Sequence, residues 1–208
     1  MSFLPLITEY LHTHSGLEAH RNYLGMSQIA DCPTQLYLRY LQGMKLDDGG
    51  HRNAYRGYMI EGEMKKILTR IGVMKERSER SLVAHWDARY QGHTDGETLE
   101  GRLLEIKSLA KHKYEQVRES KKLLTKHYFQ IQTYMKHGQY MGCDAVLICP
   151  ETFEIMVLPV QPNYKVQNDL DSKARDVLMH IDAGKLPACQ CGRCEASVSR
   201  AGRAFLLQ

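Results

Sequence analysis

The chain has 208 residues, of which 43% are hydrophobic and 25% charged, ordinary values for a globular protein with one well-buried core. Its formal net charge of +4 permits nucleic-acid binding without requiring it. No apolar run is long enough to cross a bilayer, and the first residues lack the basic and apolar stretches of a signal peptide. These features exclude a membrane-spanning chain and predict a cytoplasmic protein without a membrane partner, in a bacterial, archaeal or host-cell cytosol.

The first third of the chain is expected to be helical. Residues 5–24 predict one helix, and Ser27 is expected to cap a second helix that runs to about Leu41. A stretch rich in Asp and Gly over residues 43–52 predicts a loop, and a third helix is expected over residues 55–71.

Strands and helices are expected to alternate in the rest of the chain. Their order predicts a mixed α/β sandwich around a central sheet. The strands are expected over residues 82–86, 88–95, 102–108, 145–149 and 153–160, and the helices over residues 114–140 and 164–183.

Two carboxylates and a lysine are expected to meet at one hairpin. Glu105 and Lys107 alternate with apolar residues on a strand, so they point to the same side. Asp95 ends the preceding strand, and the turn-rich residues 96–101 allow it to reach the same place. Paired carboxylates beside a lysine suit a hard divalent cation next to a general base or water-orienting amine, which is the chemistry of phosphodiester hydrolysis. A solvated ion pair on the hairpin is the alternative.

Two helices carry further polar candidates. Glu61 lies on the apolar stripe of Gly57 and Leu68, where its carboxylate needs either a cation or a path to solvent. Gln130 and Tyr134 are four residues apart and share a helix face from which both can reach a phosphate, although such pairs are common on helices.

Basic residues gather between the strand of Glu105 and Tyr134. With Tyr114 and Tyr128 they predict a groove that follows phosphates and stacks bases, and a solvated helix face is the alternative. These residues are Lys111, Lys113, Arg118, Lys121, Lys122 and Lys126.

Four of the six cysteines predict a metal site. Three of them crowd together near residue 190, and one is expected to point inward from the second helix. Four thiolates suit a tetrahedral zinc ion or an iron–sulfur cluster, and in a cytosolic chain such a group indicates metal binding more than disulfides. Cys143 and Cys149 are expected to be ordinary core or surface residues. The four candidate ligands are Cys32, Cys189, Cys191 and Cys194.

Together these motifs resemble the PD-(D/E)XK nuclease superfamily in its RecB-like branch, with the closest likeness to the CRISPR-associated iron–sulfur exonucleases and their phage-borne relatives. The likeness covers most of the chain. It rests on a leading cysteine, a Gly-x-x-x-Glu helix, a Gly-x-x-Asp-Gly turn with Glu-Ile-Lys, a Gln-x-x-x-Tyr helix and the terminal cysteines, in that order.

The resemblance implies a restriction-endonuclease-like α/β fold. Its mixed central sheet is flanked by helices, and the cysteine metal site joins the N-terminal and C-terminal segments. It also implies a single nuclease domain over residues 1–208. Residues 45–160 would form the catalytic core, and residues 27–42 with 184–208 would form a cysteine-cluster subdomain.

The resemblance further implies a role for each candidate. Asp95 and Glu105 would bind Mg²⁺ or Mn²⁺ with the Ile106 carbonyl as a further ligand, and Lys107 would position or deprotonate the attacking water. The Gln-x-x-x-Tyr pair would support the scissile phosphate and the substrate strand. The implied catalytic residues are Asp95, Glu105, Lys107, Gln130 and Tyr134, the implied metal ligands are Glu61, Asp95, Glu105 and Ile106, and the four cysteines would hold a structural [4Fe–4S] cluster.

The chain departs from the family pattern at two places. The CRISPR-associated relatives usually carry histidine at the position of Glu61, where phage recombination exonucleases carry a carboxylate. Their terminal cysteines usually run Cys-x-x-Cys with a third several residues later, whereas this chain reads Cys-x-Cys-x-x-Cys up to Cys194. Structural Zn²⁺ is therefore the alternative to the cluster.

The expected activity is metal-dependent hydrolysis of DNA by an exonuclease that acts on single strands or DNA ends. One alternative is a structure-specific endonuclease. The others are a nucleic-acid-binding component of a spacer-acquisition or recombination complex and a zinc-stapled binding domain. The expected partners are DNA and CRISPR adaptation or recombination proteins.

Overall fold

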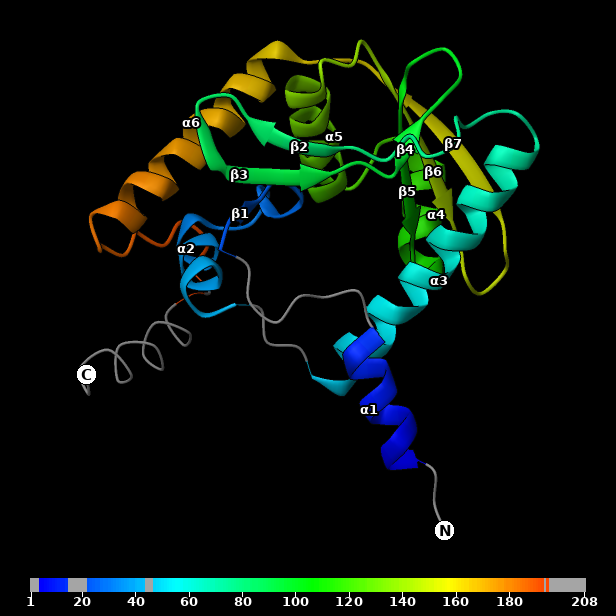
Figure 1. The fold of residues 1–208 in the computed structure, drawn as a ribbon, viewed down its shortest axis with the longest axis horizontal. Coiled ribbons are helices and arrows are strands. Elements are labelled where there is room, and N and C mark those ends of the chain that lie inside the picture. The colour runs from blue at the N-terminus through cyan, green and yellow to red at the C-terminus, as the bar shows by residue number, and fades with distance from the viewer. Residues whose placement is uncertain (1–3, 15–21, 44–46, 193, 195–208) are drawn as a thin grey trace.

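The structure is a computed structural model that describes residues 4–14, 22–43, 47–192 and 194 (Figure 1). The chain forms two sheets with helices packed on them. The elements in chain order are α1 (Leu4–His14), β1 (Leu24–Gly25), the 3-10 helix η1 (Met26–Gln28), α2 (Pro33–Gln42), α3 (Asp48–Arg70), β2 (Ser81–Ala84), β3 (Asp87–His93), β4 (Gly96–Glu97), β5 (Leu103–Ser108), α4 (Lys111–Ser120), α5 (Thr125–Gly138), β6 (Cys143–Ile148), β7 (Ile155–Val160) and α6 (Tyr164–Asp182).

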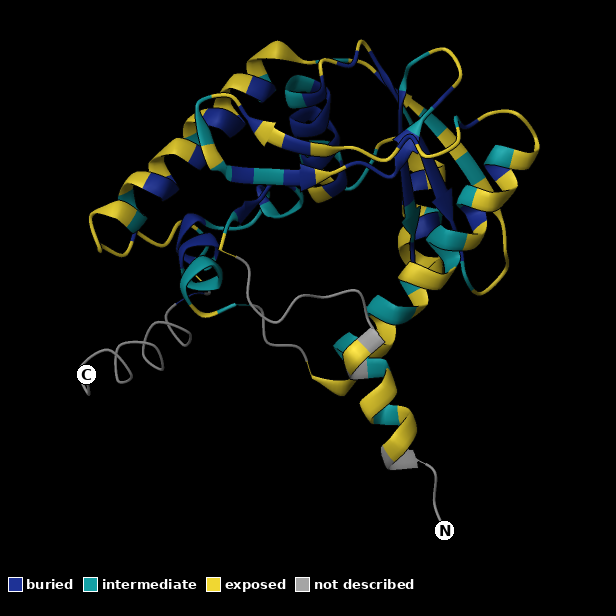
Figure 2. Ribbon diagram, viewed as in Figure 1, coloured by how far each residue is buried: buried dark blue, intermediate teal, exposed yellow. Residues whose placement is uncertain are grey.

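The four-stranded sheet has the order β4-β5-β6-β7 and is mixed, because β5 and β6 run parallel and the other pairs antiparallel. One face packs on α3, where Leu104 and Ile106 meet Met64 and Leu68 in a small buried cluster. The other face contributes to the larger core with α4 and α5. Figure 2 shows buried residues along β5 and β6 and on α5.

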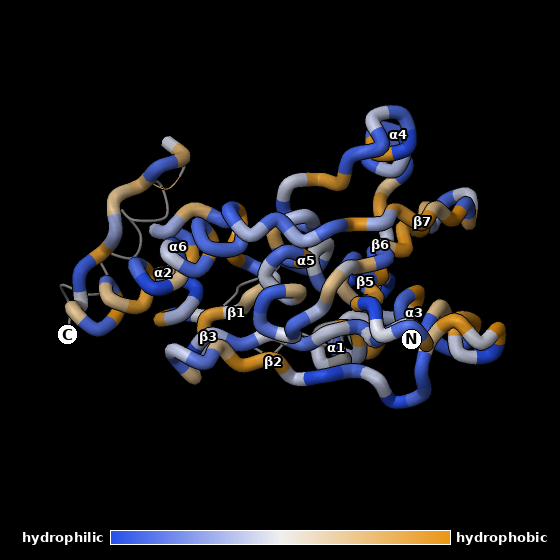
Figure 3. Tube along the Cα trace, turned by 90° about the horizontal axis from the view of Figure 1, so that it is seen from above, coloured by the Kyte–Doolittle hydropathy of each residue, from blue (hydrophilic) through white to orange (hydrophobic). Residues whose placement is uncertain are grey.

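The three-stranded sheet has the order β1-β3-β2 and lies beside the four-stranded sheet (Figure 1). Helix α5 packs against β2, η1 and α6, and its Gln130 side chain is hydrogen-bonded to Glu105 on β5, so α5 contacts elements of both sheets. Figure 3 shows hydrophobic colouring concentrated around β6 and β7, whereas α4 is mostly hydrophilic. Among the described helices, none combines the length and the apolar character needed to cross a lipid bilayer.

The predicted hairpin between the strands of Asp95 and Glu105 is wrong in its pairing. Strand β3 ends at His93 and pairs with β1 and β2. The chain then crosses to the other sheet, and the short β4 pairs with β5 through Gly96 opposite Leu104. The physical reason is that residues 94–95 leave the first sheet after a backbone hydrogen bond at Thr94, so Asp95 lies between two sheets rather than within one hairpin.

Several predicted boundaries also differ. Helix α2 begins at Pro33 rather than after Ser27, because proline suits the first helical position and the preceding residues form η1. Helix α3 begins within the expected loop, because the Asp47 side chain accepts a hydrogen bond from the Gly50 amide at 2.7 Å and caps it.

Two expected helices are shorter than predicted. The first ends at His14, and residues 15–21 lie outside the described part of the chain. The long helix expected over residues 114–140 is two helices, because Lys121 takes a left-handed conformation that ends α4.

Candidate active site

Strand β5 brings two of the predicted charged residues to one side. Glu105 is fully buried, and the Lys107 Nζ lies 2.5 Å from its Oε1. The Asp95 Oδ2 lies 3.9 Å from the same Nζ and accepts a hydrogen bond from the Ile106 amide at 2.7 Å. The predicted meeting of Asp95, Glu105 and Lys107 is therefore present in the structure.

Glu105 has one oxygen that the described residues leave without a partner. Its Oε1 accepts a hydrogen bond from the Gln130 Nε2 at 2.5 Å and contacts Lys107, whereas its buried Oε2 has no hydrogen bond. Burial and the charge of Asp95 raise the pKa of Glu105 to about 8. A buried, unpartnered carboxylate oxygen is costly. A hard divalent cation is the ligand that this oxygen fits.

Glu61 faces the same acidic centre from α3. Met64 and Leu68 of its stripe are buried, while the Glu61 side chain is part-exposed and its carboxylate lies 2.7 Å from the Lys65 Nζ. Loss of hydration and the nearby charge of Asp95 raise the pKa of Glu61. The sequence left two interpretations of Glu61, a cation ligand or a residue that reaches solvent. The structure fits both in part, because the Glu61 carboxylate forms an ion pair with Lys65 and also lies near the other carboxylates. Residues Glu61, Asp95, Glu105 and Lys107 are called the carboxylate site below.

Lys107 and Tyr134 hold their protons in this environment. Burial alone would lower the pKa of Lys107, but the negative charges of Glu105 and Asp95 outweigh burial and raise it. Burial and the charge of Glu105 raise the pKa of Tyr134, which is almost fully buried. Lys107 is therefore an ammonium that can attract a phosphate, and Tyr134 is a neutral phenol.

The predicted basic groove divides into separate groups. Lys113 and Lys126 lie close enough to Lys107 that their charges act on one another. Arg118 instead lies 3.5 Å from Glu154. The first two lysines are therefore the ones that add positive charge to that of Lys107.

Other members of the groove have different surroundings. Tyr114 is buried in the core and cannot stack on a base, so this part of the prediction is wrong. Lys121, Lys122 and Tyr128 line a cavity of about 630 Å³ between the α4–α5 connection and the end of β7. Lys111 lies 4.0 Å from Glu115 on the same helix.

Sequence reasoning missed two residues around the carboxylate site. Lys65 neutralises part of the charge of Glu61, and the signal was its i+4 spacing on a helix. His127 lies one turn before Gln130 on α5 and is buried near Lys107. Its spacing of three from Gln130 was the available signal.

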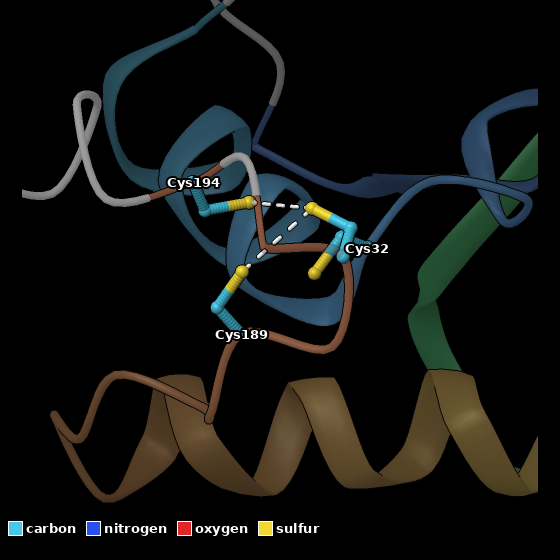
Figure 4. Close-up of side chains that lie close together, drawn as sticks. Cys32, Cys189 and Cys194 are labelled. Atoms are coloured by element: carbon cyan, nitrogen blue, oxygen red, sulfur yellow. Dashed lines mark hydrogen bonds between the residues drawn. The ribbon is translucent and has the colours of Figure 1, made fainter.

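The four predicted cysteine ligands come together at the start of α2 and in the segment after α6 (Figure 4). All four Sγ atoms lie within 4.8 Å of one another. The Cys191 Sγ is 3.7 Å from that of Cys189 and 3.3 Å from that of Cys194. Cys32 caps α2 rather than pointing inward from its middle, and its Sγ accepts a hydrogen bond from the Gln190 amide at 3.4 Å. Cys32, Cys189, Cys191 and Cys194 are called the four-cysteine site below.

Four thiol groups are soft ligands, but their pKa values differ, because burial and the neighbouring cysteine side chains raise the pKa of Cys194. Burial tends to raise the pKa of Cys32, but hydrogen bonds from Gln190 and Thr34 outweigh it and lower the pKa to about 6. The Thr34 hydroxyl also donates to the Pro187 carbonyl at 3.0 Å, which ties the two segments together. Zn–S bonds of about 2.3 Å place tetrahedral ligands roughly 3.8 Å apart. The separations of 3.7 Å and 3.3 Å from the Cys191 Sγ lie near that spacing.

Cys143 and Cys149 are both buried in the larger hydrophobic core, so the prediction that they are ordinary core or surface residues is confirmed.

No protein-family model matches the chain, and no curated protein sequence matches it. Solved structures do. An alkaline exonuclease (LHK-Exo) from Laribacter hongkongensis has a TM-score of 0.62 at 16% identity, covering 85% of this chain and 93% of that one. LHK-Exo in complex with dAMP has a TM-score of 0.62 at 15% identity, covering 94% and 98%. The protein SSO0001 has a TM-score of 0.62 at 16% identity, covering 95% and 96%.

These likenesses confirm the predicted fold class. The chain has a mixed α/β fold with helix-flanked sheets, like the fold of LHK-Exo, and its four-cysteine site joins an N-terminal and a C-terminal segment. At such low identity the comparison concerns the fold alone.

Proposed function

We propose that the chain is a divalent-metal-dependent DNA exonuclease that hydrolyses phosphodiester bonds on single strands or at DNA ends. The observation that carries the proposal is the buried Glu105 with its unpartnered Oε2, set against Asp95 and Lys107. The fold shared with exonucleases, one of them in complex with dAMP, supports the same substrate class.

The chain's own residues divide the work between binding the cation and binding the phosphate. Glu61, Asp95 and Glu105 would hold Mg²⁺ or Mn²⁺, with the Ile106 carbonyl as a further ligand. The bound cation would neutralise charge that develops on the phosphate in the transition state. Gln130 fixes the Glu105 carboxylate by its hydrogen bond.

Lys107 and Tyr134 would act on the substrate side. The Lys107 ammonium attracts a phosphate oxygen and orients the attacking water. In the reaction, water forms a new P–O bond, the P–O bond to the leaving strand breaks, and the proton lost by water is balanced by one gained from solvent by the leaving oxygen. Tyr134 would support the strand beside the scissile phosphate.

The four-cysteine site would be a structural metal site. The separations of its sulfur atoms suit a single tetrahedral zinc ion, the alternative to the [4Fe–4S] cluster that the family resemblance implies. A metal there would connect α2 to the segment after α6, and such a cross-link restrains the unfolded chain.

The test is degradation of end-labelled single-stranded DNA with Mg²⁺, Mn²⁺ or EDTA, beside a closed circular single strand. The wild-type protein should degrade the linear strand only with a divalent cation, while Lys107→Met should be inactive. Lys165→Met is the matched control, because Lys165 is exposed on α6, away from the carboxylate site. Full activity of Lys107→Met or activity in EDTA would contradict the proposal, and equal loss of the circular strand would favour an endonuclease.

A further inference from the structure

His127 is a buried histidine that the proposed chemistry does not use. It lies in the first turn of α5, is 8% exposed, and its Nε2 is buried without a hydrogen-bond partner among the described residues. Burial and the positive charges of Lys107, Lys126 and Lys113 lower the pKa of the ring to about 3, so it is neutral. A neutral imidazole has one N–H donor and one acceptor nitrogen. A buried polar atom without a hydrogen bond destabilises the folded state, unless a ligand or a water molecule forms a hydrogen bond with it.

The charges of two further lysines act on this histidine. Lys113 on α4 and Lys126 on α5 are exposed, and neither has an ion pair in the described part of the chain. Loss of hydration and the charges of Lys113 and Lys107 lower the pKa of Lys126. The acid that acts on Lys126 is Asp31, whose carboxylate is already paired with Arg39. The region therefore carries positive charge that an anion would balance.

The chemistry of this group selects a phosphate. Two ammonium groups repel a metal cation, while an imidazole N–H beside them can donate to a phosphate oxygen. Lys107 connects the group to the carboxylate site, because its charge acts on His127 and Lys126 while its Nζ contacts Glu105. A phosphate held here would thus neighbour the one at the carboxylates.

We propose that His127, Lys113 and Lys126 form a second phosphate site, which holds a non-scissile phosphate of the strand whose neighbouring phosphate is hydrolysed. This inference rests on the proposed function and adds the contact that sets the strand's position. The site orders the substrate strand before cleavage. The hydrogen bond that the His127 imidazole donates to the phosphate is one source of the affinity for the strand.

The first experiment separates binding from folding at His127. His127→Phe removes the buried nitrogen, whereas His127→Gln keeps an amide donor near the same place. Affinity for a fluorescent 12-nucleotide strand is measured with Ca²⁺ in place of Mg²⁺. His127→Phe should be at least as resistant to thermal unfolding as wild type, yet bind about tenfold more weakly, as expected for a lost bond to a charged group. His127→Gln should recover most of the affinity.

The second experiment locates the phosphate. Lys126→Met and Lys113→Met should each reduce the salt dependence of binding by about one ion, whereas Lys165→Met should not. Strands with one neutral methylphosphonate linkage are then tested at each position. At one position wild type should lose affinity, and there Lys126→Met should cause no further loss, because its partner charge is already absent.

The outcomes separate this inference from the proposed function. If wild type cleaves DNA but all three substitutions bind every strand as wild type does, the second phosphate site is wrong and the nuclease stands. If wild type binds with this pattern but never cleaves with Mg²⁺ or Mn²⁺, the site stands and the nuclease is wrong. If wild type binds none of the strands, or Lys126→Met loses equal affinity at every linkage, the second phosphate site is overturned.

Discussion

The carboxylate site and the four-cysteine site differ in what holds their ligands. Glu105 is buried on β5, between β4 and β6, and Asp95 is fixed by the Ile106 amide. Three of the cysteines instead lie after α6, where residues 185–192 form no helix or strand. The sheet fixes the geometry of the carboxylate site. The geometry of the four-cysteine site instead depends on the metal that its cysteines would bind. Removing a metal should therefore abolish activity at one site and loosen the structure at the other.

The largest expected effect tests the first half of this comparison. Asp95→Asn removes a charge from the carboxylate site, while its surroundings stay packed. We expect at least about a thousandfold loss of DNA hydrolysis, because cation binding and charge stabilisation both weaken. Thermal unfolding should shift by only a few degrees at most, because asparagine keeps a side-chain oxygen that can accept the hydrogen bond from the Ile106 amide. An active Asp95→Asn protein, or one that fails to fold, would remove the distinction between the two sites.

The second effect is on stability. Cys32→Ser should remove the metal from the four-cysteine site and lower the free energy of unfolding by about 3 to 5 kcal/mol, because the metal closes a very long loop. Iron, sulfide and zinc assays on anaerobically purified protein identify the metal, and one zinc per chain is expected. Cys149→Ala is the control, since Cys149 is buried away from the site and should leave the metal content unchanged. Four iron atoms per chain with an equal amount of sulfide would show that the site holds a [4Fe–4S] cluster and that the zinc expected from the Sγ separations is wrong.

A third prediction concerns the connection between the regions. Asp171 on α6 is hydrogen-bonded by the His137 Nε2 at 2.9 Å and contacts the Lys136 Nζ at 2.8 Å, both on α5. Partial burial tends to raise the pKa of Asp171, but these two partners outweigh it and lower the pKa to about 2. A carboxylate with a lowered folded-state pKa stabilises the protein above its unfolded pKa, and the stabilisation disappears as pH falls through the folded value.

Asp171→Asn should therefore lower the free energy of unfolding by about 2 kcal/mol at pH 7. Its difference from wild type should shrink between about pH 4 and pH 2, which chemical denaturation at several pH values measures. Asp176→Asn is the control, because Asp176 lies on the same helix and is largely exposed. A pH-independent difference would show that Asp171 acts through packing alone.

The smallest expected effect concerns Glu61. Glu61→Gln should raise the Mg²⁺ concentration for half-maximal activity by about tenfold, since one of three carboxylates loses its charge. Glu63→Gln is the matched control, because Glu63 lies two residues away on α3 and pairs with Lys66 on the exposed side. Equal Mg²⁺ requirements for both variants would leave Glu61 as an ion-pair partner of Lys65 only.

Local periodicity was enough to predict part of the carboxylate site. Alternation along a strand put Glu105 and Lys107 on one side, and the spacing of four put Gln130 and Tyr134 on one helix face. The structure places Glu105 against both Lys107 and Gln130. These relations depend on neighbours in sequence, so they survive errors in the predicted pairing of strands.

Long-range relations could not be predicted in the same way. The partner of β3 is decided by contacts with β1 and β2, and the sequence around Asp95 carries no signal of the crossing between sheets. The burial of His127 likewise depends on how α5 packs against distant elements. The cysteine grouping was visible, but the cap position of Cys32 was missed because Pro33 was not recognised as the start of α2.

The connection between Cys32 and the segment around Gln190 has a consequence for biosynthesis. The hydrogen bond from Gln190 to Cys32 spans 158 residues. Chains begin to fold from their N-terminal end during translation. The elements that carry the carboxylate site leave the ribosome before Cys189, Cys191 and Cys194 are made, so the carboxylate site can assemble first. A metal bound by the four cysteines would be inserted after that, and a cell short of it would accumulate chains with a formed carboxylate site and an untethered α2.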